Sequence, residues 1–451
     1  MLHRKVRENN MADIRPFRAV RPQSKYAKEV AALPYDVVSR EEAKEEIKKH
    51  PLTFLKMDRP ETSFSDDVPY NDPRVYPKAR EIFETEMNDG VYISDDAKHY
   101  YIYELTMDGR VQTGIAAVAS VDDYENNVIK KHENTRAEKE LDRINHVDQM
   151  SAQTGPIFLA YREDRTISQI VSEIKAEIDS LENNPECKRD ILTDDISSER
   201  AALLCDFKSD DGIRHRVIRI DSSEDNIAIQ EAFKNIDSIY IADGHHRAAS
   251  AVKVSKMRRK ENPDYAGDEE FNYFLSVLFP DNELKILSYN RVVKNLNGYS
   301  DDEFVSKLCK RFELLSSGEG EEFPAEKNEF SMYLPNENMH GGTYYVFRFR
   351  EEDIPSDPVG SLDVSLLQNL LLDPILGIKD PRTDERIDFV GGIRGMGELV
   401  KRCHEDMAVA FYMYPTSISE LFNVADAHLL MPPKSTWFEP KLRSGLFIHC
   451  I

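Results

Sequence analysis

The chain has 451 residues, a length that predicts more than one domain. Its 59 Lys and Arg residues face 82 Asp and Glu residues, and the net charge of −23 disfavours broad binding to nucleic acids or anionic lipids. No apolar run reaches the roughly 20 residues of a membrane span, no signal peptide is visible, and five dispersed cysteines indicate neither a disulfide framework nor a thiolate zinc site. We therefore expect a cytoplasmic protein without a membrane or nucleic-acid partner; a homodimer stays open.

The N-terminal third predicts alternating helices and strands. Ser39 and Glu42 form a capping box, which predicts a helix that ends before Pro51. Residues 53–57 are predicted as a short strand, and residues 73–88 as a charged helix. Two further strands, 99–105 and 111–121, are joined by an Asp-Gly sequence that is typical of a hairpin.

The rest of the chain continues the alternation without the regularity of a doubly wound sheet. The predicted elements include strands over 157–161, 238–242, 274–279 and 407–413, and helices over 137–150, 167–181, 247–260, 300–315 and 363–377. The expected fold class is α/β, or α+β with mixed sheets. We expect two regions: a nucleotide-binding core over 11–296 and an added C-terminal α/β region over 297–451.

The strongest candidate site is the sequence Asp243-Gly244-His245-His246-Arg247, which follows a predicted buried strand and opens a helix. Glycine permits the tight turn, and the first amides of a helix favour an anion such as a phosphate. Arginine adds a fork of donors, histidine can donate or transfer a proton, and aspartate can hold magnesium or accept a proton. The alternatives are a strand-end cap with an incidental histidine pair, or a metal site at the two histidines.

A second cluster, Lys130 to Arg136, also follows a short predicted strand. Glu133 is a candidate base for a hydroxyl nucleophile, and the cations around it could neutralise phosphate charge. A solvated charged turn is the alternative. The remaining polar groups of this cluster and of the helix after it are Lys131, His132, Thr135, Arg136, Lys139 and Arg143.

Three weaker candidates lie elsewhere, and each can also be a purely structural turn. Asp36 lies in Pro-Tyr-Asp-Val-Val, just before a helix cap. Lys434 precedes Ser-Thr-Trp as at the end of a phosphate loop, but the upstream glycines are missing. The glycine-rich segment 391–395 could form an anion-binding turn.

Six motifs taken in order resemble a widespread prokaryotic family, domain of unknown function 1015. They are PYDVV, HENT, GPIFLAY, IADGHHR, LSYNRVV and MPPKSTWFEPK, and the resemblance extends from about Ile14 to His449. The IADGHHR region is in turn similar to the nucleotide-binding core of ParB partition proteins, sulfiredoxin and an archaeal free-serine kinase. In that superfamily a Gly-x-x-Arg turn holds nucleotide phosphates, which implies the same use for Gly244 and Arg247.

The departures from these relatives narrow what the resemblance implies. Sulfiredoxins carry a reactive cysteine where this chain has His245, so sulfinic-acid reduction is not implied. ParB proteins carry a basic helix-turn-helix, which is absent from this sequence. The serine kinases are most similar in the Asp-Gly-His-His-Arg turn, although they are much shorter, and they imply phosphoryl transfer.

Two functional hypotheses follow. The first is an ATP- or ADP-dependent kinase that uses Mg²⁺ and phosphorylates a small hydroxyl compound, with free serine as the first candidate. The second is a non-catalytic, nucleotide-dependent regulatory protein of the ParB type. The expected catalytic groups are Glu133, Asp36 and His246, the expected metal ligand is Asp243, and the expected phosphate contacts are Asp243, Gly244, His245, His246, Arg247, Lys131, His132, Thr135, Arg143 and Lys434.

Overall fold

The computed structural model describes residues 11–135, 137–183, 196–336 and 341–451, without the side chains of residues 138 and 139. The chain divides into two compact units. Unit 1 contains the described residues up to Leu284 together with Pro440–Ile451, and unit 2 is Lys285–Glu439. The C-terminal region predicted over 297–451 differs from unit 2 at both ends, because unit 2 begins earlier, at Lys285, and ends earlier, at Glu439. The reason is long-range strand pairing, which a local pattern does not reveal.

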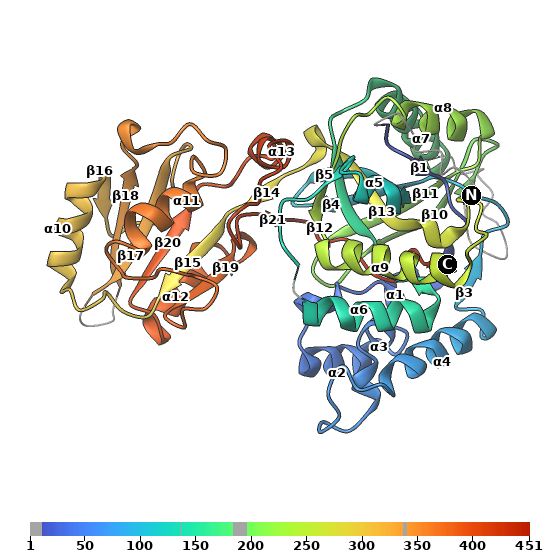
Figure 1. The fold of residues 1–451 in the computed structure, drawn as a ribbon, viewed down its shortest axis with the longest axis horizontal. Helices are drawn as coiled ribbons and strands as arrows, with labels where there is room; N and C mark the ends of the chain where they lie inside the picture. Colours follow the sequence, from blue (N-terminus) through green and yellow to red (C-terminus); the bar gives the residue numbers. More distant parts are fainter. Residues whose placement is uncertain (1–10, 136, 184–195, 337–340) are drawn as a thin grey trace. The chain divides into compact units, whose positions relative to one another are not determined.

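The largest sheet among the described residues lies in unit 1 and has ten strands (Figure 1). Its order is β6-β12-β8-β13-β5-β4-β11-β10-β9, with β1 beside β5. The pairs β6–β12 and β8–β13 are parallel and the other pairs are antiparallel, so the expected mixed α/β fold is confirmed. The strands are β1 (Ile14–Arg15), β4 (Tyr101–Met107), β5 (Arg110–Ser120), β6 (Ile129–Lys130), β8 (Ile157–Tyr161), β9 (Ile196–Ser197), β10 (Ala201–Lys208), β11 (Arg214–Ile220), β12 (Ile239–Asp243) and β13 (Tyr273–Pro280).

Two short sheets also belong to unit 1, and one of them uses the end of the chain. β2 (Val20–Pro22) pairs with β3 (Tyr92–Ser94), and β7 (Ala152–Gln153) pairs with β22 (His449–Cys450). The second pairing is one reason why the last residues belong to unit 1 rather than to the C-terminal region.

The helices of unit 1 follow the local sequence signals well, with one exception. The capping box of Ser39 and Glu42 starts α2, and the Asp-Gly hairpin turn has φ of 50° at Asp108 and 78° at Gly109. Residues 53–57 were predicted as a strand, which is wrong: α3 lies there, because a short apolar run has no period that separates strand from helix. The helices are α1 (Ser24–Val30), α2 (Arg40–Lys49), α3 (Leu55–Asp58), α4 (Val75–Asn88), α5 (Val121–Glu125), α6 (Ala137–Met150), α7 (Arg165–Glu182), α8 (Ser223–Phe233) and α9 (His245–Glu261), with a 3₁₀ turn η1 (Tyr35–Val37).

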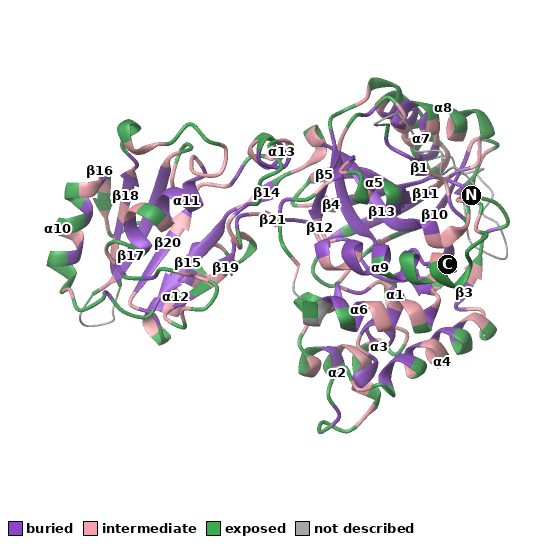
Figure 2. Cartoon of the chain, viewed as in Figure 1, coloured by how far each residue is buried: buried purple, intermediate pink, exposed green. Residues whose placement is uncertain are grey.

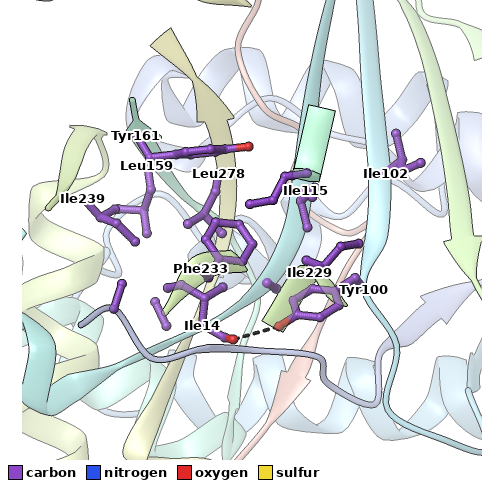
Figure 3. Close-up of a cluster of buried hydrophobic side chains, with 14 of the residues drawn as sticks. Ile14, Tyr100, Ile102, Ile115, Leu159, Tyr161, Ile229, Phe233, Ile239 and Leu278 are labelled. Atoms are coloured by element: carbon purple, nitrogen blue, oxygen red, sulfur yellow. Dashed lines mark hydrogen bonds between the residues drawn. The ribbon is translucent and has the colours of Figure 1, made fainter. Parts of the chain in front are cut away.

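The central strands of unit 1 are buried along their length (Figure 2). Their apolar side chains pack with those of α7 and α8, and Figure 3 shows Phe233 of α8 among strand residues such as Leu278 and Ile115. Tyr100 lies in the same core and donates its hydroxyl to the carbonyl of Ile14 at 2.7 Å. A buried hydroxyl that is satisfied in this way costs little, so the core can hold the large ring.

Unit 2 is built on a six-stranded sheet in which every pairing is antiparallel. Its order is β16 (Glu313–Gly318), β18 (Gly342–Arg348), β17 (Glu329–Pro335), β20 (Val409–Met413), β15 (Tyr289–Val293) and β19 (Ile387–Gly391). The helices are α10 (Asp301–Arg311), α11 (Asp363–Leu367), α12 (Gly395–Glu405) and α13 (Ile418–Asp426), and the short strands β14 (Ile286–Leu287) and β21 (Trp437–Phe438) pair with each other. The predicted helix over 300–315 ends earlier, at Arg311, and β16 follows.

In neither unit do the described residues include a helix that is long and apolar enough to cross a membrane.

Candidate functional site

Two neighbouring strands bring the two main motifs together. β6 and β12 are parallel, with Ile129 opposite Ile239 and Lys130 opposite Tyr240. Because parallel neighbours end at the same edge of a sheet, residues 131–135 and 243–247 both leave the sheet at this edge. The structure therefore answers what the sequence alone left open, namely whether the two motifs lie close together.

The contact between the motifs is made by imidazole rings and a carboxylate. The rings of His132 and His245 have centroids 4.5 Å apart and are nearly perpendicular. The Nδ1 atom of His245 lies 3.9 Å from a carboxylate oxygen of Glu133, whose side chain is 53% exposed. Glu133 is thus open to a ligand on one side and held next to the turn on the other.

The turn itself has the backbone of an anion-binding site. Gly244 has a φ of 91° and is the N-cap of the 17-residue helix α9, without a side-chain cap. The left-handed φ favours glycine, and the first amides of the helix provide a positive end for an anion. Asp243 ends β12, and its Oδ1 accepts the Gly244 amide at 2.8 Å.

Asp243 forms an ion pair with a residue from the end of the chain. Lys441 donates its Nζ to Oδ2 of Asp243 at 2.9 Å. Burial raises the pKa of Asp243, but Lys441 and Arg247 outweigh burial and hold this pKa below its ordinary value. Asp243 is therefore ionised and stabilises both Lys441 and the turn.

This pairing does not fit the expected role of Asp243 as a magnesium ligand. Both carboxylate oxygens already accept from nitrogen donors. Within residues 11–135, 137–183, 196–336 and 341–451, no group of three His, Cys, Asp or Glu residues could hold a metal ion. Lys441 was missed as a site residue, although it lies in the MPPKSTWFEPK motif, seven positions after the lysine that was chosen.

The two buried histidines are neutral at neutral pH. Burial lowers the pKa of His132 to about 4, although Asp243 acts in the opposite direction. Burial and the neighbouring His132 hold the pKa of His245 well below its ordinary value. Nδ1 of His132 and Nε2 of His245 are buried without a hydrogen-bond partner in the described structure. His245 thus does not fit the expected proton transfer near neutral pH, whereas both rings can still exchange neutral hydrogen bonds with a ligand.

Arg247 connects the turn to the Pro-Tyr-Asp-Val-Val motif. Its Nη1 donates to the carbonyl of Pro156 at 3.0 Å, and its Nη2 lies 3.5 Å from Oδ1 of Asp36. The guanidinium also lies over the ring of Tyr35, 5.8 Å from the centroid, and that of Arg143 lies 4.0 Å from the same ring. Burial raises the pKa of Tyr35, against the effect of Arg143. Three separate predicted motifs thus meet at one tyrosine.

Arg143, beside this ring, is held by two carboxylates. Its Nη2 forms an ion pair with Oδ2 of Asp142 at 2.8 Å, and its Nη1 lies 3.9 Å from Oδ1 of Asp58. Burial opposes its charge, but Asp142, Tyr35 and Asp58 hold the pKa of Arg143 above its ordinary value. A cavity of about 30 Å³, room for roughly one water molecule, lies here. Its lining includes Tyr35, Asp58, Arg143, His146, Thr154 and Arg247.

The other predicted residues differ in how closely they join this cluster. Lys131 places its ammonium over the ring of Tyr124 at 4.3 Å, and the hydroxyl of Thr135 donates to Glu140. His246 lies in the first turn of α9, where its carbonyl accepts the hydroxyl of Ser250 at 2.7 Å.

Arg136 and the side chain of Lys139, which were also predicted as candidates, lie outside the part of the chain that the structure describes. Lys434 belongs to unit 2, where its Nζ lies 5.3 Å from the centroid of the Tyr289 ring, and the glycine-rich segment 391–395 also belongs to unit 2.

Comparison with known proteins identifies the family. The family model described as "Protein of unknown function (DUF1015)" matches residues 14–365, and the chain belongs to this family. The match ends before His449, the limit of the sequence resemblance, and of the candidates described here it leaves out the glycine-rich segment 391–395, Lys434 and Lys441. No curated protein matches.

Several solved structures are similar to the chain. A mutant free serine kinase in complex with AMP has 13% identity and a TM-score of 0.32, and covers 74% of this chain and 92% of its own. Another mutant of a free serine kinase, in complex with ADP, has 13% identity and a TM-score of 0.31, with coverages of 75% and 93%. A C-terminally truncated SbnI from Staphylococcus aureus has 8% identity and a TM-score of 0.34, with coverages of 73% and 85%. At these TM-scores the similarity carries no argument about activity.

Proposed function

We propose that this member of the family is a nucleotide-dependent phosphotransferase. It transfers a phosphoryl group from ATP or ADP to a small hydroxyl compound, with free serine as the first candidate. The observation that carries the proposal is the shared edge of β6 and β12. There an exposed carboxylate, Glu133, lies beside a glycine turn that opens a long helix and is flanked by Arg247 and Lys441.

The turn is proposed to hold the phosphates. Amides at the start of α9 would bind the phosphate oxygens, and Arg247 would add donors in a fixed geometry. Phosphoryl transfer depends on positioning and on charge neutralisation rather than on covalent chemistry by the protein. Magnesium would enter with the nucleotide, as part of the substrate, and would neutralise charge between its phosphates.

Two carboxylates are candidates for accepting the proton of the hydroxyl group. Glu133 lies beside His245, which is neutral, and Asp36 lies beside Arg247, which is charged. Each contacts a different residue of the turn, so the direction from which the acceptor approaches decides between them. A base removed from such a reaction typically costs a factor of about 10² to 10⁴ in rate.

The acceptor is proposed to bind near Tyr35. Arg143 and Arg247 both lie over this ring, and two guanidinium groups suit an acceptor that carries a carboxylate, such as a hydroxy amino acid. The cavity of about 30 Å³ is too small for an amino acid. The acceptor would therefore bind at its opening, and Tyr35 would have to shift or the side chains around it would have to open.

The experiment is a turnover assay on the full-length protein. ATP or ADP with Mg²⁺ is incubated with serine, threonine, homoserine and glycerate, and phosphorylated product is measured directly. We expect turnover with at least one acceptor, and a loss of at least 10²-fold in kcat for either Glu133→Gln or Asp36→Asn, which identifies the base. Glu224→Gln, an exposed charge change in α8, is the matched control and should not change the rate.

The outcome also separates the two classes of function. Calorimetric binding of nucleotide to the folded protein, without turnover of any acceptor and unaffected by Glu133→Gln, would replace the kinase by a nucleotide-dependent regulatory protein. Absence of nucleotide binding would contradict both. A cytoplasmic location belongs to the same proposal, because that compartment supplies ATP and ADP.

A further inference from the structure

We propose that unit 1 contains a second ligand site, which binds a small aliphatic amine. A cavity of about 360 Å³ lies among α1, η1, α2, α3, the loop between β10 and β11, and Arg443. This volume falls within the range of small-molecule pockets in proteins. Its lining includes no residue of the strand-end segments 131–135 and 243–247.

One part of the cavity lining is apolar. Leu55 is buried, whereas Val37 is 44% exposed although it lies at the cavity. An apolar side chain left open to a cavity gains free energy when an alkyl group covers it, about 25 cal/mol for each Å² removed from water. The apolar lining residues are Ala31, Leu33, Val37, Val38 and Leu55.

The polar part of the lining carries an excess of negative charge. Six carboxylates face three cations, His50 not counted. The carboxylates are those of Glu29, Glu42, Glu45, Glu46, Asp210 and Asp211, and the cations are Lys28, Lys49 and Arg443. Such an excess attracts a cation and repels a carboxylate or phosphate.

The excess is concentrated on α2. Glu45 and Glu46 follow Glu42 by three and four positions, so both lie on the same side of this helix as Glu42, and all three line the cavity, where like charges repel each other. Glu42 accepts the Ser39 amide at 2.7 Å, and Glu46 lies 3.9 Å from His50. Within the part of the chain that the structure describes, Glu45 has no ion pair. The charges on the loop side are better compensated, since Asp211 pairs with Arg443 and Asp210 lies 3.2 Å from His50.

These observations favour an organic amine over a metal ion. Among the described residues, no three His, Cys, Asp or Glu side chains are arranged so that they could hold a metal ion, and the cavity has far more room than a bare ion needs. An ammonium group can lie against the α2 carboxylates while its alkyl chain covers the exposed side chain of Val37. The site is independent of the proposed kinase activity, although it shares η1 with the candidate site: Tyr35 lines the small cavity and Val37 lines the large one.

The experiment is calorimetric titration of the full-length protein at low salt, without nucleotide. The probes are 1,5-diaminopentane, 1-aminopentane and, as the charge-reversed control, glutarate. We expect saturable 1:1 binding of the amines and none of glutarate. The double variant Glu45→Gln/Glu46→Gln should weaken amine binding at least tenfold, whereas Glu41→Gln, on the same helix but outside the cavity, should leave it unchanged.

A variant of the apolar wall tests the same site if the charge variants are unstable. Val37→Asp should retain or strengthen the binding of 1,5-diaminopentane, but it should weaken that of 1-aminopentane, whose alkyl end needs an apolar wall. No saturable amine binding at millimolar concentration would overturn the proposal, and so would equal binding of glutarate or equal effects of Glu41→Gln and the double variant. None of these results bears on nucleotide turnover, which is measured separately.

Discussion

Among the described residues, the β-sheets of the two units differ in that only the ten-stranded sheet of unit 1 contains parallel strand pairs, and the polar groups are arranged accordingly. The six-stranded sheet of unit 2 is antiparallel throughout, so strand ends alternate between its two edges. Unit 1 contains the parallel pair β6–β12, whose carboxyl ends meet at one edge and bring His132, Glu133 and the turn 243–247 together. One parallel pairing in a largely antiparallel sheet is thus enough to join two motifs about 110 positions apart in the sequence.

The units also differ in which ionisable groups they bury. Unit 1 buries histidines with a lowered pKa, such as His132, whereas unit 2 buries Asp363 with a raised pKa. Between about pH 4 and pH 7 both groups favour the neutral form inside the protein, but they exchange protons with water in opposite directions on unfolding. The stabilities of the two units should therefore depend on pH with opposite signs, and the following predictions start there.

The largest effect is expected at Asp363, which is 7% exposed and accepts the Asn328 amide at 3.0 Å. Burial raises its pKa from 3.8 to about 7. The folded state keeps the proton that the unfolded carboxyl loses, so unit 2 loses stability as pH rises from about 4 to about 7, by up to about 4 kcal/mol. Asp363→Asn should remove this dependence. The free energy of unfolding is measured by urea denaturation at pH 5 and at pH 8. The signal is the fluorescence of Trp437 in unit 2, the single tryptophan of the chain. An unchanged pH dependence in the variant would contradict the assignment.

The opposite sign is expected at His132, which is 3% exposed. Its pKa is about 4 in the folded protein against 6.5 for an ordinary histidine, so the unfolded chain takes up the proton first. Unit 1 should lose stability as pH falls from about 6.5 to about 4, by up to about 3 kcal/mol. His132→Gln should flatten this loss, measured by hydrogen exchange of the β12 amides between pH 4.5 and 7. His428→Gln, at an exposed position of unit 2, is the control, and an equal change in that variant would refute the prediction.

A moderate effect is expected at the phosphate side of the cluster. Arg247→Lys retains the charge but loses the fork that reaches Pro156 and Asp36 together. Nucleotide affinity should fall roughly thirtyfold, or about 2 kcal/mol. Arg258→Lys, near the other end of α9, should bind nucleotide as the unchanged protein does. Calorimetry with ADP measures both, and equal affinities for the two variants would remove Arg247 from the site.

The smallest effect is expected from the backbone of the turn. Gly244→Ala places a Cβ at a φ of 91°, which should destabilise unit 1 by about 1 kcal/mol. Gly397→Ala, inside α12 of unit 2, has open space around the new methyl group and an ordinary φ, so it should stabilise by up to about 1 kcal/mol. Urea denaturation compares them, and shifts of the same sign would show that turn strain is not the cause.

Local patterns predicted those parts of the fold that local interactions determine. The capping box of α2, the hairpin between β4 and β5, and the strand 157–161 depend on neighbouring residues, and each occurs where it was expected. The strand predicted at 53–57 is wrong, because five mostly apolar residues carry no usable period. Unit 2 begins at Lys285, before the predicted boundary at 296/297, since the pairing of β15 with β19 and β20 places β15 in unit 2.

In the candidate site, too, residues recognisable from their neighbours in the sequence were predicted, whereas residues that matter through long-range contacts were not. The turn 243–247 and Glu133 could be proposed from residue types at strand ends, and their proximity follows from a pairing that the sequence does not display. Asp58, Asp142 and Lys441 were not proposed, because their significance lies in contacts with residues that are distant in the sequence. Lys441 nevertheless had a signal, namely a second lysine within a motif that had already been singled out.

The return of Pro440–Ile451 to unit 1 has a consequence for biosynthesis. Unit 2 is an insertion in unit 1, and the segment translated after unit 2 supplies Lys441 to Asp243 and β22 to β7. Unit 2 can fold during translation, as domains generally do, whereas unit 1 is completed only after unit 2 has been synthesised. A nascent chain stalled before residue 440 would hold Asp243 without the ion pair to Lys441, so the turn would be completed only once Pro440–Ile451 has been made. The order of synthesis itself would then leave shorter copies with an incomplete turn.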